Sequence, residues 1–282
     1  MNFKVTLAAL LLLAACGGNP FPGDVDEDTD GDGVPDTVSE AVPEEVAVNL
    51  RAITYKPGNG GSLSVNMDGL VGSPLNVTFQ RNEALDISGY RAFSYQETGT
   101  QRTHLALVRD NARGNLRALA TADGGQFNRH FGGTYFARLD AFTRPAVGTG
   151  KEAGQFSYAG SYAGVFVSDG ESTTPGLPGA LAPTGNLRVR GDALINANFA
   201  NDNVNGGVAN RWLLDASGNR VDLNGDGRIS AADKLADITF PETEINEVGG
   251  FLGDVEFSGA PGLAIGSVAG LFGGRAASDI AA

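Results

Sequence analysis

The most regular hydrophobic pattern in the chain runs from Gln155 to Val167. Read with a period of two, one face of this stretch alternates aromatic rings with glycines: Phe156, Tyr158, Gly160, Tyr162, Gly164 and Phe166. The other face carries small side chains: Ser157, Ala159, Ser161, Ala163 and Val165. Strict alternation over this length predicts a β-strand and argues against a helix. Glycines beside rings suit a sharply curved sheet, so the pattern favours a small closed barrel, with an ordinary sandwich strand as the alternative.

Short alternating or apolar runs, separated by turn signals, predict further strands on both sides of this stretch. The predicted strands before it span residues 46–55, 62–67, 75–80, 85–97, 102–110, 115–121 and 132–139. After it, the run Leu187–Phe199, a turn at Asn201–Asn203 and the run Val204–Leu214 predict a long β-hairpin. The last predicted strands span residues 238–240, 244–248, 254–258 and 264–272. No segment has a helical period over three turns, so the pattern predicts an all-β protein built from antiparallel strands.

The chain begins with an export signal rather than with part of the fold. Lys4 supplies a positive charge, and Val5–Ala15 is an apolar run of 11 residues. Such a run suits the apolar core of a signal peptide, because a helix that spans a bilayer needs about 20 residues. Residues 13–17 read Leu-Ala-Ala-Cys-Gly, which resembles the lipobox of bacterial lipoproteins. An ordinary secretory signal with an incidental cysteine is the alternative.

The lipobox resemblance implies that residues 1–15 are removed and that Cys16 becomes the first residue, acylated with palmitate or a similar chain. Cys16 is the only cysteine in the chain, so we expect a mature fold without disulfides. Three acyl chains, as the resemblance implies, would anchor the protein firmly, because each buried CH₂ contributes about 0.8 kcal/mol. Gly17, rather than an aspartate, follows the cysteine. By the sorting rule of such lipoproteins, this implies the outer membrane.

Acidic residues are concentrated near the amino terminus. The chain holds 33 Asp and Glu against 20 Lys and Arg. Ten of the acidic residues and none of the basic ones lie between Asp24 and Glu45, so we interpret residues 16–45 as an acidic linker. The rest of the chain is only mildly acidic and lacks the positive charge that nucleic-acid binding needs. We therefore expect no nucleic-acid partner.

A calcium-type loop is the strongest local motif in the chain. Side-chain oxygens stand at positions 1, 3, 5, 9 and 12 of this loop, and a backbone carbonyl stands at position 7. The predicted ligands are Asp222, Asn224, Asp226, Arg228, Ser230 and Asp233. Gly227 at position 6 permits the sharp turn, and the spacing closely resembles dockerin-type EF-hand loops. A dockerin has two such loops with partner helices, so we predict a Ca²⁺ site without the dockerin function; an Asx-rich turn without an ion is the alternative.

The acidic linker holds a second run with calcium-type spacing. Its predicted ligands are Asp28, Asp30, Asp32 and Asp36. Gly33 again stands at position 6, and the run resembles the aspartate-rich calcium repeats of thrombospondin type 3 domains. It departs from an EF-hand loop at position 12, which is Ser39. A second Ca²⁺ site and a solvated acidic spacer are equally compatible with this run.

Residue patterns that carry catalysis are missing from the sequence. The two histidines, His104 and His130, fall in predicted strand regions without metal-ligand spacing, and we interpret them as packing or surface residues. The chain has no Gly-x-Ser-x-Gly elbow, no phosphate-binding loop and no free cysteine nucleophile. We therefore predict that the protein is not an enzyme.

Several of these features together resemble the transferrin-binding protein B-like surface lipoproteins, which include a factor H-binding type. The likeness rests on the lipobox, the acidic linker, the hairpin around residues 205–207 (Asn-Gly-Gly) and the glycine-rich ending Val268–Arg275. It implies an antiparallel eight-stranded β-barrel at residues 149–282, preceded by a small handle-like β domain at residues 46–148. The last strand, with the glycine spacing of the first, would close the barrel. No transferrin-contacting motif can be matched, so transferrin binding is not implied.

The resemblance implies a lipoprotein anchored in the outer membrane, displayed on the cell surface or facing the periplasm. We expect it to bind a protein or a nutrient- or metal-carrying ligand through loops, chiefly Ser168–Gly185 and Asp222–Asp233. A lipocalin-like carrier with a small apolar ligand inside the barrel is one alternative, and a structural envelope protein is another. The carrier would be disfavoured by a core filled with four aromatic residues: Phe156, Tyr158, Phe199 and Trp212.

Overall fold

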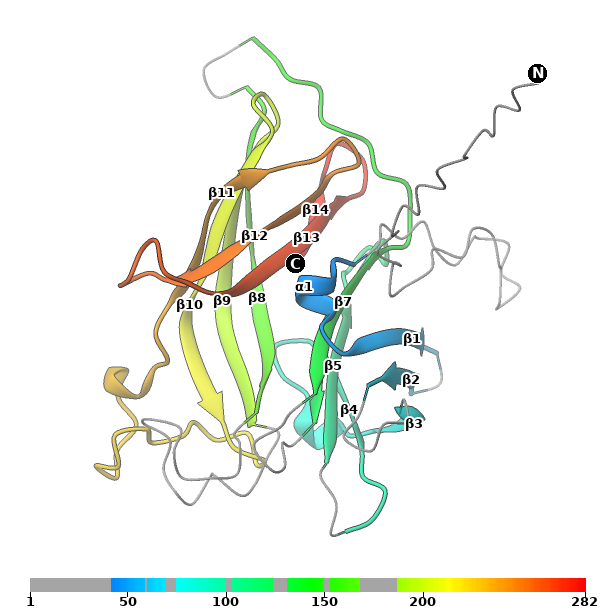
Figure 1. Cartoon of the computed structure of the whole chain (residues 1–282), viewed down its shortest axis with the longest axis vertical. Coiled ribbons are helices and arrows are strands. Elements are labelled where there is room, and N and C mark those ends of the chain that lie inside the picture. Colours follow the sequence, from blue (N-terminus) through cyan, green and yellow to red (C-terminus); the bar gives the residue numbers. More distant parts are fainter. Residues whose placement is uncertain are drawn as a thin grey trace, which may run out of the picture.

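The computed structural model describes residues 42–58, 60–68, 75–99, 103–123, 131–149, 153–167 and 187–282 (Figure 1). Cys16, the acidic run Asp28–Asp36, His130 and the loop Ser168–Gly185 lie outside the described residues. Within the described part, fourteen strands form two seven-stranded sheets, and neighbouring strands run antiparallel. The same part of the chain has no helix that is long and apolar enough to cross a membrane.

The first sheet is a meander in which each strand pairs with the next one in sequence. A short helix, α1 (Glu44–Ala47), leads into it. Its strands are β1 (Leu50–Lys56), β2 (Ser62–Met67), β3 (Leu75–Arg81), β4 (Arg91–Tyr95), β5 (His104–Asp110), β6 (Leu116–Asp123) and β7 (Gly132–Arg138), with the 3₁₀ helix η1 (Glu83–Leu85) before β4. In β2 the buried residues Leu63, Val65 and Met67 alternate with more exposed ones. One face of β2 therefore lies in the core, as the period of a β-strand requires, whereas β5 is buried on both faces.

The first and last strands of this sheet meet at the corner between α1 and β1. The amide of Asn49 donates to the carbonyl of Gly132 (3.0 Å). Gly133 packs so closely under α1 that a Cβ atom there would overlap the carbonyl of Ala47. The sheet is thereby nearly closed into a barrel.

The second sheet is also a meander. Its strands are β8 (Gln155–Phe166), β9 (Leu187–Asn198), β10 (Asn203–Leu214), β11 (Ile238–Glu244), β12 (Gly250–Phe257), β13 (Ala264–Gly273) and β14 (Asp279–Ala281), with the 3₁₀ helix η2 (Ala231–Asp233) before β11. Figure 1 shows β8, β9 and β10 side by side, with β12 and β13 crossing at an angle to them. Rings from both groups meet, such as Tyr158 on β8 and Phe272 on β13, whose centroids lie 5.5 Å apart. The sheet therefore curls around an aromatic core.

The alternating stretch forms β8 as predicted, and the two faces of the strand pack differently. On the ring-bearing face, Tyr158 packs against the aromatic core, and Tyr162 packs against a second apolar cluster further along. Phe156, near the start of the strand, keeps 36% of its surface exposed. On the opposite face, Ala163 and Val165 pack against residues of the first sheet. The period of two thus reflects a strand that is covered on both sides over its second half.

The predicted eight-stranded barrel with a small handle is wrong, because each sheet has seven strands. The family resemblance had implied that number of strands. The predicted strand boundaries near residue 240 are also wrong, because a proline, which cannot donate to a ladder, lies inside a strand. In the structure Pro241 lies in β11, where the register with β10 shifts between Val204 and Gly206. Such a bulge absorbs the proline. The strands predicted at 238–240 and 244–248 are therefore replaced by the single strand β11.

The two sheets pack against each other. Ala269 and Leu271 of β13 are buried among side chains of the first sheet. Arg188 on β9, only 1% exposed, donates to the carbonyls of Leu85 (2.8 Å) and Asp215 (2.6 Å). Its burial lowers the pKa of Arg188, against the attraction of nearby carboxylates. The predicted boundary between two domains at residue 148 falls in the connection between β7 and β8. That the two parts are separate domains stays a prediction.

Candidate functional site

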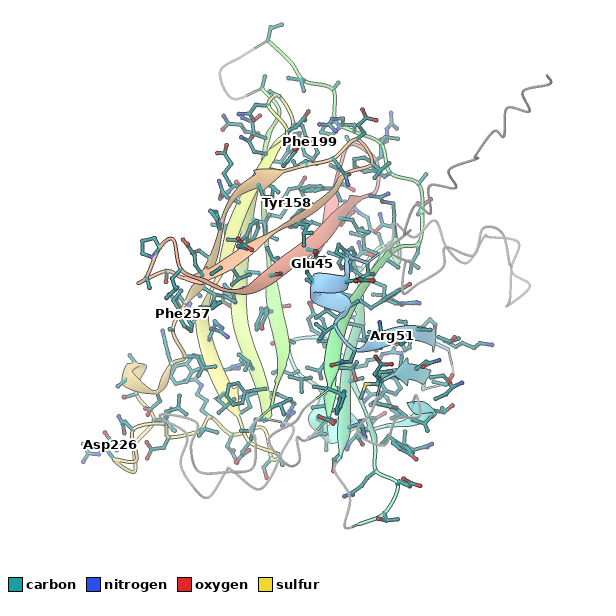
Figure 2. All side chains as sticks on the ribbon, viewed as in Figure 1. Glu45, Arg51, Tyr158, Phe199, Asp226 and Phe257 are labelled. Atoms are coloured by element: carbon teal, nitrogen blue, oxygen red, sulfur yellow. The ribbon has the colours of Figure 1, made fainter. Side chains whose placement is uncertain are left out.

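The predicted calcium loop lies between β10 and β11. Val221 before it and Leu235 after it pack against apolar side chains of the second sheet. Between these anchors, residues 224–232 are exposed, and Figure 2 shows Asp226 at the outer edge of the molecule. The sequence thus forms a surface loop that is held at both ends by buried apolar contacts.

Side chains of the loop accept hydrogen bonds from its own backbone amides. Asp222 accepts from the amides of Gly225 (2.7 Å, at Oδ1) and Gly227 (2.6 Å, at Oδ2). Asn224 and Asp226 each accept from the amide two residues later, at 2.9 and 2.8 Å. These local turns fix the backbone of the loop and direct the three side chains along it.

Asp233 closes the loop from the inside. Its side chain is buried, and Oδ1 accepts from the amides of Leu223 (3.0 Å) and Asn224 (3.2 Å). Its Oδ2 accepts from the amide (2.7 Å) and the hydroxyl (3.2 Å) of Ser230, in a capping box that starts η2. The hydrogen bond from the Ser230 amide, with the other donors, lowers the pKa of Asp233 although burial opposes this shift.

The residues of the loop fit a calcium ion only in part. Asp222, Asn224 and Asp226 offer the oxygen ligands that Ca²⁺ prefers. Asp233, predicted at position 12, uses both oxygens for hydrogen bonds within the protein. Among the described residues, no group of three His, Cys, Asp or Glu side chains is arranged to hold a metal. The Ca²⁺ site therefore stays a prediction.

The only tryptophan is a neighbour of this loop that the sequence pattern did not reveal. Trp212 on β10 is 8% exposed, and the guanidinium of Arg220 lies 4.1 Å from the centroid of its ring. The ammonium of Lys234 lies 5.7 Å from the same centroid. Arg220 precedes the loop and Lys234 follows it, so both ends of the loop contact one ring. Fluorescence of Trp212 therefore reports on the loop.

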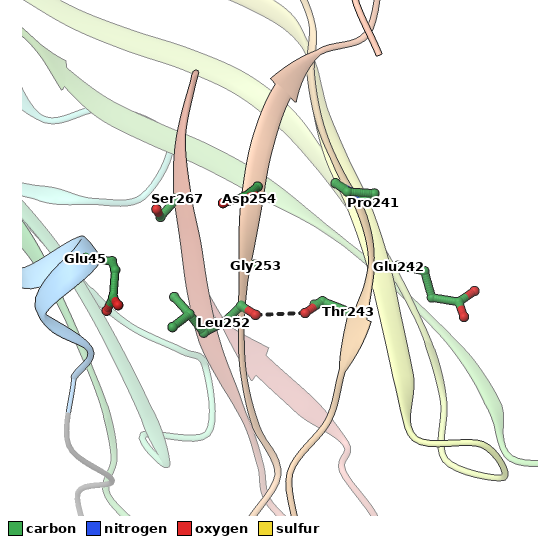
Figure 3. A pocket seen from close by; sticks show the side chains of 8 residues that line it. All are labelled: Glu45, Pro241, Glu242, Thr243, Leu252, Gly253, Asp254 and Ser267. Carbon is green, nitrogen blue, oxygen red and sulfur yellow. Dashed lines mark hydrogen bonds between the residues drawn. The ribbon is translucent and has the colours of Figure 1, made fainter. Parts of the chain in front are cut away.

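A groove opens where β11 and β12 separate (Figure 3). Only Ile238 and Thr239 of β11 are paired with β12, and further along the Thr243 hydroxyl donates to the carbonyl of Leu252 (2.7 Å). The groove has a volume of about 380 Å³ and is lined by Glu45, Pro241, Glu242, Thr243, Leu252, Gly253, Asp254 and Ser267. Three of these residues, Glu45, Glu242 and Asp254, are acidic, and neither histidine nor cysteine is among them.

A set of exposed apolar side chains lies on the β12–β13 hairpin, which projects from the side of the second sheet (Figures 1 and 2). Its members are Phe257 (39% exposed), Leu263 (63%) and Ile265 (43%), and we call them the apolar tip. Glu256 fixes the turn, because its side chain accepts from the amide of Gly262 (2.5 Å). Residues 257–274 hold no charged side chain, which is the sequence signal that could have revealed the tip.

Aromatic rings fill the interior of the second sheet. Phe272 is fully buried, and its ring centroid lies 5.0 Å from that of Phe199, 5.5 Å from that of Tyr158 and 5.9 Å from that of Phe251. The hydroxyl of Tyr158 donates to the carbonyl of Ala277 (2.6 Å). Burial raises the pKa of Tyr158 to about 12, so this hydroxyl keeps its proton at neutral pH. Of the four aromatic residues expected to fill one core, Tyr158 and Phe199 belong to this cluster, whereas Phe156 keeps 36% of its surface exposed and Trp212 packs against the first sheet.

Of the two histidines, His104 lies in the described part of the chain. It is half-buried on β5, and its ring centroid lies 5.9 Å from that of Tyr95 and 6.2 Å from that of Phe79. Contacts of this kind are packing contacts between rings. They agree with the packing role that the sequence suggested.

No family model matches the chain, and no curated protein matches it. The family resemblance therefore rests on the sequence motifs alone. The structure supports its coarser content, which is an antiparallel all-β body with nearly closed, barrel-like sheets.

Proposed function

We propose that this protein is a lipid-anchored, non-enzymatic binding protein of the outer membrane that captures a protein ligand with the apolar tip and neighbouring loops. The observation that carries the proposal is the tip itself. Three large apolar side chains are exposed at the end of one projecting hairpin, while other exposed ones, such as Val48, Leu194 and Ile229, stand on separate elements. Exposed apolar clusters of this kind mark interaction sites.

A protein partner suits the chemistry of the tip. Full burial of a wholly exposed side chain of this size contributes about 1.5–3 kcal/mol, so covering the partly exposed Phe257, Leu263 and Ile265 would contribute part of that for each. Residues 257–274 carry no charge, so the contact would be made mainly by uncharged residues, with Glu256 as the adjacent charged group. A few such anchors can supply most of the binding free energy of an interface.

The filled interior favours binding at the surface over carriage of a small apolar ligand. Phe199 and Phe272 are buried at the centre of the second sheet, and Trp212 is buried between the sheets. A carrier needs a cavity of about 300 Å³ or more inside its barrel. The groove between β11 and β12 lies outside this core and is lined by carboxylates.

The lipid anchor is proposed from the lipobox resemblance alone. Acylation of Cys16 would tether the body to the outer membrane through the acidic linker, where the tip could meet ligands. The resemblance to transferrin-binding protein B-like lipoproteins favours the same function, because members of that family bind diverse partners through loops. The seven-stranded sheets depart from the eight-stranded barrel of that family.

Photo-crosslinking on intact cells tests this function. A photoreactive residue at Leu263 of the full-length protein should give one discrete adduct with a partner. A matched control at Val48, which is 54% exposed beside the first sheet, should give none. Phe257→Ser combined with Ile265→Ser should abolish the adduct and leave the melting temperature close to that of the wild type, because both side chains are exposed. Equal adducts at Leu263 and Val48, or none at either, would contradict the proposal.

We also propose that the loop Asp222–Asp233 binds Ca²⁺ weakly. Its ligands would be Asp222, Asn224, Asp226, Arg228 through its carbonyl, and Ser230, with Asp233 free to join only after it gives up its hydrogen bonds. Bound calcium would supply positive charge that draws the exposed oxygens together. Extracellular sites work at dissociation constants of about 10⁻⁴–10⁻³ M, so a weak site is compatible with this compartment. The linker run Asp28–Asp36 offers the same chemistry in sequence.

Calcium should change the fluorescence of Trp212, because residues at both ends of the loop contact its ring. At ten times the dissociation constant, binding should stabilise the protein by about 1.4 kcal/mol. Asp226→Asn keeps an oxygen for the local turn and removes the charge, and it should weaken both responses. The matched control is Asp215→Asn, the same change in a neighbouring turn where Asp215 accepts from the amides of Ser217 and Asn219. If millimolar calcium changed neither the fluorescence spectrum nor the melting midpoint of the wild type, this calcium site would be ruled out.

A further inference from the structure

Three of the four sheet edges in the described structure are covered. In the first sheet, β1 and β7 approach each other where Asn49 donates to the carbonyl of Gly132. In the second sheet, β14 lies beside β6, and Asp279 forms an ion pair with Arg113 (2.7 Å). The fourth edge belongs to β8, which pairs with β9 alone, although β8 also lies near β5 and β6 of the first sheet (Figure 1).

The first half of β8 is open to solvent along this edge. Among described residues, no backbone hydrogen bond joins 156–166 to anything outside the ladder between β8 and β9. Phe156, Ser157, Ala159 and Gly160 are exposed, and a Cβ atom added at Gly160 would meet no atom within 4 Å. In an antiparallel sheet, every second residue of an edge strand directs its N–H and C=O away from the sheet. This segment therefore offers backbone donors and acceptors to another strand.

The edge of β8 also lacks the features that normally keep strands apart. Proteins guard edge strands with charged residues, prolines or bulges. The edge strand β1, for example, carries Arg51 and Lys56. In contrast, β8 has neither a charged residue nor a proline, and its register with β9 runs from Gln155 to Phe166 without a shift. An unguarded edge of this kind is expected to be covered in the assembled protein.

We propose that β8 pairs with β8 of a second copy of the chain, antiparallel and about a two-fold axis at Tyr158. Symmetric pairing places Phe156 of one copy opposite Gly160 of the other. The ring would take the open space over the glycine, as aromatic residues cover edge glycines in other sheets. On the opposite face, Ser157 would lie against Ala159. The segment is thus uncharged and complementary to itself, which favours a two-fold contact between copies over a strand from a different protein.

The test is the mass of the full-length protein in detergent, from light scattering with the detergent subtracted. Wild type should have twice the mass of one chain. Ser157→Lys combined with Ala159→Lys places lysines directly opposite each other across the pair, and like charges there are destabilising. This variant should fall to the mass of one chain. The matched control is Leu194→Lys combined with Asn196→Lys. These two residues of β9 are the ladder partners of Ala159 and Ser157, so the control adds the same charge one strand away from the contact and should stay dimeric.

A charge swap distinguishes a lost contact from a damaged fold. Ser157→Glu combined with Ala159→Glu should also be monomeric alone. Mixed with the lysine variant, it should restore a dimer that contains one chain of each kind, because opposite charges then face each other. Wild type with the mass of one chain, or a lysine variant that remains dimeric, would overturn the proposal. A wild-type chain that is paired only with a different protein would overturn it as well.

Discussion

Gly133→Ala should destabilise the protein by more than about 4 kcal/mol, the range reached only when a substitution breaks the core or the backbone of a fold. A Cβ atom at residue 133 would overlap the carbonyl oxygen of Ala47, lie 2.8 Å from its carbonyl carbon and lie 2.9 Å from Cβ of Leu50. Two of these atoms belong to the backbone, so a change of rotamer cannot relieve the overlap. The corner between α1 and β1 would have to move away from β7, which opens the first sheet. Guanidinium unfolding followed by circular dichroism measures the loss.

The matched control is Gly58→Ala, the same substitution after β1 in the same sheet. A Cβ atom at Gly58 would meet nothing within 4 Å. We expect its unfolding free energy to stay within about 0.5 kcal/mol of wild type. If Gly133→Ala unfolded at the same denaturant concentration as Gly58→Ala, the close packing of α1 on β7 would be refuted.

Phe272→Ala should cost about 3–5 kcal/mol, the usual range for removing a buried phenylalanine. Phe272 is 0% exposed and contacts the rings of Tyr158, Phe199 and Phe251. Its removal leaves a cavity where β8, β9, β12 and β13 meet, and so it weakens the curled half of the second sheet. Thermal and guanidinium unfolding of the variant measure the loss.

Phe257→Ala is the control, because it removes the same ring from the exposed end of the adjacent strand. Phe257 keeps 39% of its surface exposed, so its replacement should cost much less than that of Phe272. Similar losses for the two variants would show that the aromatic cluster is not the core of the second sheet. They would also weaken the argument that the tip is free to bind.

Where alternation is long, the sequence was sufficient to predict the strands. The hairpin predicted at Leu187–Phe199 and Val204–Leu214 is β9 and β10 to within one residue at each end. The predicted strands were wrong where pairing within the sheet outweighed the local preference of the sequence. Pro241 lies inside β11 because a bulge accommodates it, and β14 is too short for any pattern but forms because it pairs with β13. The number of strands therefore depended on contacts between distant segments.

In the candidate sites, too, local spacing was predictable from the sequence and contacts between distant residues were not. The spacing of Asp222, Asn224 and Asp226 predicted a loop, and they lie in one. The spacing could not show that Asp233 is buried, because its four hydrogen-bond donors come from both ends of the loop. The apolar tip was not identified from the sequence, because an apolar residue in an alternating strand is normally interpreted as a core residue. The fold shows that the end of this hairpin lies beyond the sheet.

We propose that the protein binds a partner through the apolar tip rather than by holding a ligand inside. The most direct measurement is the yield of crosslinked adduct from Leu263 on intact cells, compared with the yield from Val48. We expect an adduct from Leu263 that disappears when Phe257 and Ile265 are replaced by serine, and no adduct from Val48. An adduct whose yield is unchanged by those serines, or that forms equally from Val48, would contradict it.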